Sequence, residues 1–147
     1  MYSKSQMPTS AWIARQSADG TVHVVPCQMD GYLNGVGRKL FRFYDTADKV
    51  SNLINAGEIR FLGRTLHDTD YCTEGDRPAV YESIAKCLFH FYESSTVKHL
   101  YLYNETNGAW YWKHRCQPVD NNNIANVGCG ESYTPMWDGT RLDTIFR

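Results

Sequence analysis

The first apolar pattern in the chain consists of two β-prone runs separated by Ala18-Asp19-Gly20, in the segment SAWIARQSADGTVHVVPCQ. An Asp-Gly pair between such runs is a strong hairpin signal, because glycine readily takes the positive φ angle that a tight turn requires. The pattern predicts one strand over about residues 11–16 and a second over about 21–28. The fold should therefore open with an antiparallel hairpin.

After the second strand the apolar periodicity changes to that of a helix. Four apolar residues recur at i, i+4, i+7 and i+8, namely Val36, Leu40, Phe43 and Tyr44. This spacing places them on one face of an α-helix. A second short helix follows, with Asp45 or Thr46 as its N-cap and Gly57 just beyond its C-terminus.

A third helical pattern begins near Pro78, a residue that the first turn of a helix tolerates, with Asp76 as a candidate N-cap. Its apolar residues continue at helical spacing to about Glu93: Val80, Ile84, Cys87, Leu88 and Phe91. The sequence thus predicts about three helices after the first hairpin, the last of which ends near Glu93.

A second hairpin is predicted in TVKHLYLYNETNGAWYWKHR, with Asn107-Gly108 in its turn. Its side chains alternate between two faces, Leu100 and Leu102 against Tyr101 and Tyr103, then Trp110 and Trp112 against Tyr111 and Lys113. Both faces are large and partly apolar. We expect one face to pack on helices and the other to meet a neighbour or a partner.

These elements predict an α+β fold, in which two β-hairpins form an antiparallel sheet and about three helices pack on one face of it. Residues 1–116 are expected to form a single domain. Residues 117–147 are rich in Asn, Gly, Thr and Ser but also contain many apolar residues. We therefore expect this C-terminal segment to be extended and to pack on the domain or on a partner subunit.

Residues 57–77 have no sustained period and mix acidic with basic side chains. A loop of this length in a compact domain is usually functional or disordered. Its two aromatic residues, Phe61 and Tyr71, favour an ordered loop.

Composition limits the class of protein. The chain of 147 residues is long enough to bury a core, and its formal net charge is −1, with no long run of like charges. That charge argues against direct binding of duplex DNA, but one small anion could still be held by two or three arginines. No signal peptide or long apolar span is visible, which predicts a cytoplasmic protein with no membrane partner.

The five cysteines, Cys27, Cys72, Cys87, Cys116 and Cys129, include no C-x-x-C pair. In a reducing compartment we expect free thiols. A zinc site built from scattered Cys and His residues is the minor alternative, and no metal and no cofactor are predicted.

Four phrases occur in a recognisable order: CQMDGYL (27–33) with Gly37 and Leu40, GEI (57–59) with Leu62-Gly63, then Asp68 and Tyr71, and finally YLY (101–103) with Trp110-Tyr111. Together they resemble a family of small proteins of bacteriophages and mobile elements that carry a (W)DGY(P)xxxxG motif after an N-terminal hairpin. The resemblance covers roughly residues 11–115. It implies phage origin, a site in the host cell cytoplasm and no assigned reaction.

This chain departs from the family phrase at three positions. Gln28 replaces a histidine, Met29 a tryptophan and Leu33 a proline. Any chemistry that the family performs with that histidine or tryptophan is therefore missing here.

The corner at residues 30–37 has two interpretations. In the structural one, Asp30 uses its carboxylate to bind backbone N–H groups where the strand becomes a helix. In the functional one, the glycines let backbone N–H groups approach a phosphate-like ligand, and arginines of the 57–77 loop complete the site. The predicted ligand-binding residues are Asp30, Gly31, Tyr32, Gly35, Gly37, Arg38, Arg60, Arg64, Tyr71 and Arg77.

No nucleophile–base signature is present, so no catalytic residues are predicted. If the chain is an enzyme, acting on nucleotides or nucleic acid, the acid–base groups would be Asp30, His67 and Asp68. A non-catalytic binder agrees better with the aromatic hairpin and the apolar tail, and the residues expected to contact a partner are Tyr103, Trp110, Trp112 and Trp137.

The predicted function is that of a phage-encoded accessory protein that counters a host defence system by binding. Its target would be a host defence protein or a small nucleotide-like signal. The chain could also form a homo-oligomer. The alternatives are the small enzyme described above and a purely structural or regulatory module.

Overall fold

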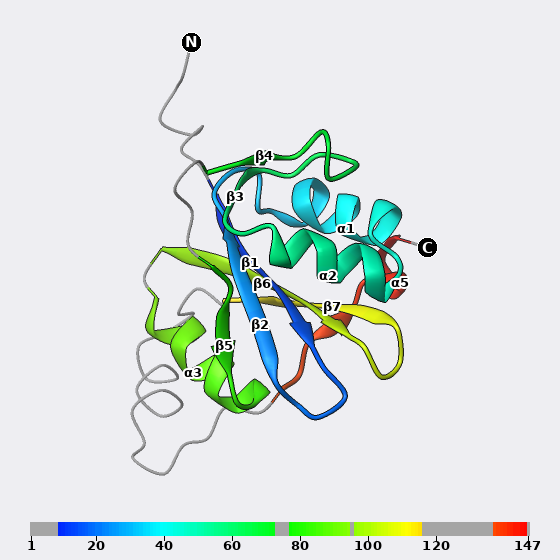
Figure 1. Cartoon of the computed structure of the whole chain (residues 1–147). Coiled ribbons are helices and arrows are strands. Elements are labelled where there is room, and N and C mark those ends of the chain that lie inside the picture. Colours follow the sequence, from blue (N-terminus) through cyan, green and yellow to red (C-terminus); the bar gives the residue numbers. More distant parts are fainter. Residues whose placement is uncertain (1–8, 73–76, 95, 116–136, 147) are drawn as a thin grey trace.

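The protein is built around a mixed eight-stranded sheet with helices on both faces (Figure 1). The computed structural model describes residues 9–72, 77–94, 96–115 and 137–146. The strand order is β4-β3-β2-β1-β6-β7-β8, and β5 pairs with β2 off this path. The α+β class is therefore confirmed.

Both predicted hairpins form and meet at the centre of the sheet. Their strands are β1 (Ser10–Gln16) with β2 (Val22–Cys27), and β6 (Val97–Asn104) with β7 (Ala109–His114). Gly20 and Gly108 have φ angles of +94° and +69° in the two turns. Asp-Gly and Asn-Gly therefore produce the turns that their local chemistry favours.

The sheet is not the antiparallel one predicted from two hairpins, because β1 and β6 run parallel, with Ile13 opposite Tyr101. Four short strands extend it, namely β3 (Ile59–Phe61), β4 (Asp70–Tyr71), β5 (Ala79–Tyr81) and β8 (Thr140–Arg141). The edge of β2 is shared by two of them. β3 pairs at Cys27, and β5 pairs at the other end of β2.

Four α-helices and one π-helical turn occur in the described residues: η2 (Leu33–Gly37), α1 (Arg38–Phe43), α2 (Ala47–Asn55), α3 (Ile84–Glu93) and α5 (Asp143–Phe146). Thr46 caps α2 by accepting a hydrogen bond from the Lys49 amide, and Gly57 follows that helix with a φ angle of +104°. Both end signals of this helix are confirmed.

The predicted third helix begins later than its apolar spacing suggested. α3 starts after Ser83, whose side chain accepts a hydrogen bond from the Lys86 amide. Val80, assigned to that helix from the spacing, lies instead in β5 opposite His23. Pairing with the free edge of β2 thus overrides the local helical pattern in this segment.

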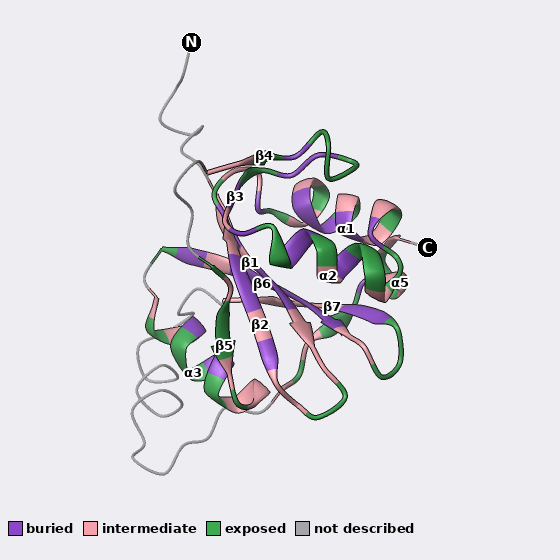
Figure 2. Ribbon diagram, viewed as in Figure 1, coloured by how far each residue is buried: buried purple, intermediate pink, exposed green. Residues whose placement is uncertain are grey.

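The helices cover both faces of the sheet rather than one. α1, α2 and α5 cover the face that carries Ile13 and Tyr101, whereas α3 covers the face that carries Ala14 and Leu100. Figure 2 shows the buried residues gathered on the central strands and on the inward sides of the helices. Alternate residues of one strand therefore belong to two separate cores.

The second hairpin packs one face on helices, as expected, but Tyr103 and Trp110, which were expected to contact a partner, are both buried. The reason is that α1, α2 and α5 cover their face of the sheet, and the Trp110 indole N–H donates to the Tyr44 carbonyl at 2.7 Å. Trp112 and Trp137 are half-buried, and the Trp137 ring lies 6.1 Å from that of Tyr111.

Part of the C-terminal segment joins the same body. The Leu142 side chain is fully buried and its amide donates to the Trp110 carbonyl at 3.0 Å. The Phe146 ring lies 5.8 Å from that of Phe41 on α1. Residues 137–146 therefore pack on the domain, while 116–136 lie outside the described residues.

None of the helices in the described part has the length and hydrophobicity that a membrane crossing requires.

Candidate functional site: a cationic and aromatic surface

The 30–37 corner uses its backbone amides inside the fold. The Gly31 amide donates to the Thr9 carbonyl at 2.8 Å, and the Gly35 amide to the Tyr32 carbonyl at 2.9 Å. The Val36 amide donates to the Asp30 carbonyl at 2.9 Å, and Asp30 has a φ angle of +57°. It is thus the Asp30 carbonyl that closes the corner, and these three amides are not directed at a ligand.

The glycines of the corner allow it to lie close against the sheet. A Cβ atom on Gly31 would lie 2.8 Å from the Ser10 carbonyl carbon, and one on Gly37 would lie 3.0 Å from the Tyr101 ring. The Tyr101 hydroxyl donates to the Gly31 carbonyl at 2.7 Å and ties the corner to β6. This packing supports the architectural interpretation of the glycines.

The loop after β3 is ordered by a buried threonine. The Thr69 hydroxyl accepts a hydrogen bond from the Gly63 amide at 3.1 Å and donates to the Thr65 carbonyl at 2.8 Å. The Tyr44 hydroxyl donates to the Gly63 carbonyl at 2.8 Å. Tyr71 packs against the same core, and burial raises the pKa of both tyrosines. The loop is therefore fixed to α1 through Tyr44.

The four predicted arginines have different surroundings. Arg60 pairs with Asp70 at 3.6 Å. Arg77 is exposed and precedes β5, whose register with β2 places it toward the Cys27 end of β2, where β3 pairs. Arg38 is the first residue of α1, and the Arg64 guanidinium lies over the Phe43 ring of that helix. The structure thus brings two of the four to one helix.

All three cation–π contacts of the described residues involve α1. The Arg38 guanidinium lies 4.8 Å from the centre of the Phe146 ring, and the Arg64 guanidinium lies 5.6 Å from that of Phe43. The Lys39 ammonium lies 4.1 Å from the centre of the Phe61 ring. α5 and the loop between β3 and β4 both lie beside α1 (Figure 1). Three elements therefore contribute to one surface.

We call this the α1 surface and define it by nine residues: Arg38, Lys39, Arg42, Phe43, Phe61, Arg64, Leu66, Ile145 and Phe146. Phe61, Leu66 and Ile145 are exposed to 37%, 38% and 36%. Phe and Arg side chains, two residue types that are enriched in protein interfaces, lie together on this surface.

The four cations of the α1 surface form no ion pair with a carboxylate in the described part of the chain. Arg38 donates to the Asn34 side chain at 2.9 Å, and Lys39 donates to the Leu62 carbonyl at 2.8 Å. Two nearby carboxylates already have partners, Asp45 with Lys49 and Asp143 with Arg141. The surface therefore carries four cations without a carboxylate partner, on a chain whose net charge is −1, and the exposed Asp68 lies on the same loop as Arg64.

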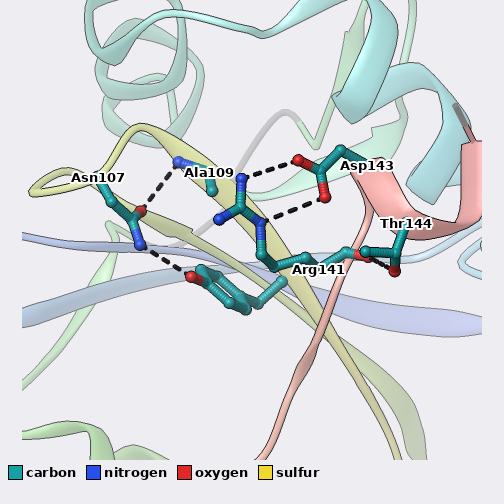
Figure 3. A network of polar contacts seen from close by, with 6 residues as sticks. Asn107, Ala109, Arg141, Asp143 and Thr144 are labelled. Atoms are coloured by element: carbon teal, nitrogen blue, oxygen red, sulfur yellow. Dashed lines mark hydrogen bonds and ion pairs between the residues drawn. The ribbon is translucent and has the colours of Figure 1, made fainter.

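A small pocket of about 100 Å³ lies beside this surface, lined by Phe41, Asp45, Gly108, Ala109, Trp110, Arg141 and Asp143. Figure 3 shows that two of its polar lining residues, Arg141 and Asp143, bind each other. The Arg141 guanidinium makes two bonds to the Asp143 carboxylate, and the Asn107 side chain holds the Ala109 amide at 3.1 Å. The volume is well below the roughly 300 Å³ at which ligand pockets begin.

A buried imidazole lies elsewhere on the same face of the sheet. His99 is 8% exposed, and its Nδ1 accepts a hydrogen bond from the Trp112 indole at 3.0 Å. Its ring lies 4.8 Å from that of His114. Burial and, second, the nearby His114 lower the pKa of His99 to about 4. Within the described ranges no three His, Cys, Asp or Glu side chains form a group that could hold a metal ion.

The three residues of the enzyme hypothesis come from two separate segments. His67 and Asp68 are exposed on the loop, and Asp30 lies at the corner. Among the described residues no hydrogen bond or ion pair joins Asp30 to either of them. The enzyme hypothesis therefore receives no support from this geometry.

Comparison with protein-family models, with curated proteins and with solved structures finds no match to this chain. The likeness to phage proteins stays a prediction from the sequence.

Of the nine residues of the α1 surface, only Arg38 and Arg64 were among the predicted site residues. The seven that the prediction left out are Lys39, Arg42, Phe43, Phe61, Leu66, Ile145 and Phe146. For the three on α1 the signal is the mixture of basic and aromatic residues in RKLFRF (38–43), whereas the other four lie in separate segments.

Proposed function

We propose that this chain is a phage-encoded accessory protein that counters a host defence system by binding a host protein without turnover. The phage origin and the host cytoplasm as its place of action rest on the sequence resemblance. The binding role rests on one observation, which is that all three cation–π contacts of the described residues gather on α1.

Arginine and aromatic side chains are enriched at protein interfaces and dominate their binding energy. On the α1 surface they lie beside Leu66 and Ile145, so that charge and apolar area are combined. This position differs from the predicted partner site, because Tyr103 and Trp110 support the core beneath α1 instead. We keep the hypothesis of a protein target but assign its binding to the α1 surface instead of the second hairpin.

A nucleotide-like target is the weaker alternative. The amides of Gly31, Gly35 and Val36 already donate within the fold, so the corner lacks the donors that a phosphate would need. Arg60 is already paired with Asp70, and the guanidinium groups of Arg38 and Arg64 each lie over an aromatic ring. Three of the four arginines proposed for the nucleotide therefore already have a partner within the fold.

The first test is an infection assay joined to native mass spectrometry. Cells that carry a defence system are infected with a phage that the system blocks, with and without the chain expressed. We expect expression to restore plaques, and we expect the chain purified from these cells to retain a host protein in a fixed ratio. A retained small molecule would instead support the nucleotide-like target, and rescue at far below one chain per target would support an enzyme.

A further inference from the structure

We infer that the α1 surface binds an acidic protein segment that carries apolar residues among its carboxylates. This inference rests on the proposed function and names the chemistry of its partner. The cations of the surface are Arg38, Lys39, Arg42 and Arg64, and none has a carboxylate partner among the described residues. A partner that supplies carboxylates would complete these pairs.

The arginines are held in place before any partner arrives. Arg38 is fixed at two points, with its guanidinium 4.8 Å from the Phe146 ring and its Nη2 donating to Asn34 at 2.9 Å. Arg64 lies over Phe43 at 5.6 Å. A guanidinium that rests on a ring keeps N–H groups at its edge, which suits a carboxylate held by two bonds. Less side-chain freedom is then lost on binding.

The exposed apolar side chains of the surface should be covered by apolar residues of the partner. Phe61 and Leu66 are exposed on the loop side of α1, and Ile145 is exposed on the α5 side. A nucleic acid offers only sugar carbons and thymine methyl groups to cover such side chains, whereas a peptide with Leu or Ile between its acids offers larger aliphatic groups. The pairing of charge with aliphatic exposure therefore favours protein over nucleic acid.

The rings of this surface are poor platforms for bases. Phe146 has Arg38 against it and a second contact with Phe41 at 5.8 Å, and Phe43 carries Arg64 while packing against the core. Single-stranded nucleic acid is usually held by open aromatic faces on which bases stack. The third ring, Phe61, has the Lys39 ammonium 4.1 Å from its centre. Each of the three rings thus already has a cation over it, which argues against that class of partner.

The test titrates the full-length, ¹⁵N-labelled chain with three probes while its amide signals are recorded. The probes are a short peptide of alternating Glu and Leu, the same peptide with Lys in place of Glu, and a single-stranded oligothymidylate of matching charge. We expect the acidic peptide alone to shift signals of residues 38–43 and 59–66, with weaker binding at higher salt. Stronger shifts with the oligothymidylate, or no shifts with the acidic peptide, would overturn the inference.

Charge reversal provides a matched pair of variants. Arg42→Glu combined with Arg64→Glu should weaken binding of the acidic peptide about tenfold, since both side chains are exposed. Arg77→Glu combined with Lys86→Glu makes the same change in net charge at two exposed residues outside the α1 surface and should leave the affinity within about twofold. An equal loss in both variants would show that only net charge matters and would refute a defined surface.

A charge-preserving variant tests the role of the rings. Arg38→Lys combined with Arg64→Lys keeps two positive charges but removes the planar groups, so we expect a loss of about threefold. The same variants are then tested in the infection assay. Loss of peptide binding with full plaque rescue would reject the α1 surface and leave the proposed function standing. Peptide binding by a chain that rescues no plaques would reject the proposed function alone.

Discussion

The buried imidazole of His99 should make the protein less stable in mild acid. Its Nδ1 accepts a hydrogen bond from the Trp112 indole, and protonation at that atom would remove the acceptor. A proton on His99 would also be placed 4.8 Å, ring to ring, from His114. Burial first, and then the nearby His114, therefore favour the neutral form, and the pKa of His99 falls from 6.5 to about 4.

The sign follows from proton linkage. Between about pH 6.5 and about pH 4 the unfolded chain binds a proton at His99 that the folded chain does not bind. The free energy of unfolding must therefore fall as the pH is lowered through this range. Above about pH 6.5 the contribution of His99 to stability is fully present. One pKa unit corresponds to about 1.4 kcal/mol, so this one group accounts for about 3 kcal/mol.

The assay is urea unfolding followed by tryptophan fluorescence at several pH values across this window. His99→Asn keeps an acceptor near the Trp112 indole but does not titrate, so its stability should change by about 3 kcal/mol less than that of the wild type. His67→Asn, at an exposed loop position, is the control and should follow the wild type. Parallel pH curves for the wild type and His99→Asn would refute the reasoning.

Three further predictions concern stability in urea at neutral pH. Gly31→Ala should cost about 1–3 kcal/mol, because its Cβ would meet the Ser10 backbone, and an unchanged midpoint would contradict the close packing of the corner. Trp110→Phe should cost about 1–3 kcal/mol, because it leaves the buried Tyr44 carbonyl without its donor; a neutral effect would mean that water replaces the indole. Leu142→Ala should cost about 2–5 kcal/mol, since the side chain is fully buried, and a loss below 1 kcal/mol would show that the segment does not dock.

Several features were predictable because their causes are local. Both hairpin turns follow from a glycine that is needed within a few residues of the strands it joins. The second helix begins at Thr46 and ends before Gly57 because side-chain capping and a positive φ angle act within one turn. The alternation in the second hairpin also holds, since successive side chains of a strand point to opposite faces.

What the pattern left undecided depends on segments far apart in the chain. Nothing near Val80 shows that β2 has a free edge for it, and only that edge turns a helical spacing into a strand. Likewise, no local signal shows that β1 and β6 run side by side in parallel. Two hairpins alone therefore suggested an antiparallel sheet with helices on a single face.

The candidate surface was decided by tertiary structure in the same way. The basic and aromatic residues of RKLFRF are visible in the sequence, and Arg38 and Arg64 were singled out. Their aromatic partners come from other elements, Phe146 from α5 for the first and Phe43 from α1 for the second. The sequence by itself determined which side chains could bind, because their chemistry is intrinsic. Only the packing of α5 and the loop against α1 decided which of them share a surface, because burial and pairing depend on contacts between distant residues.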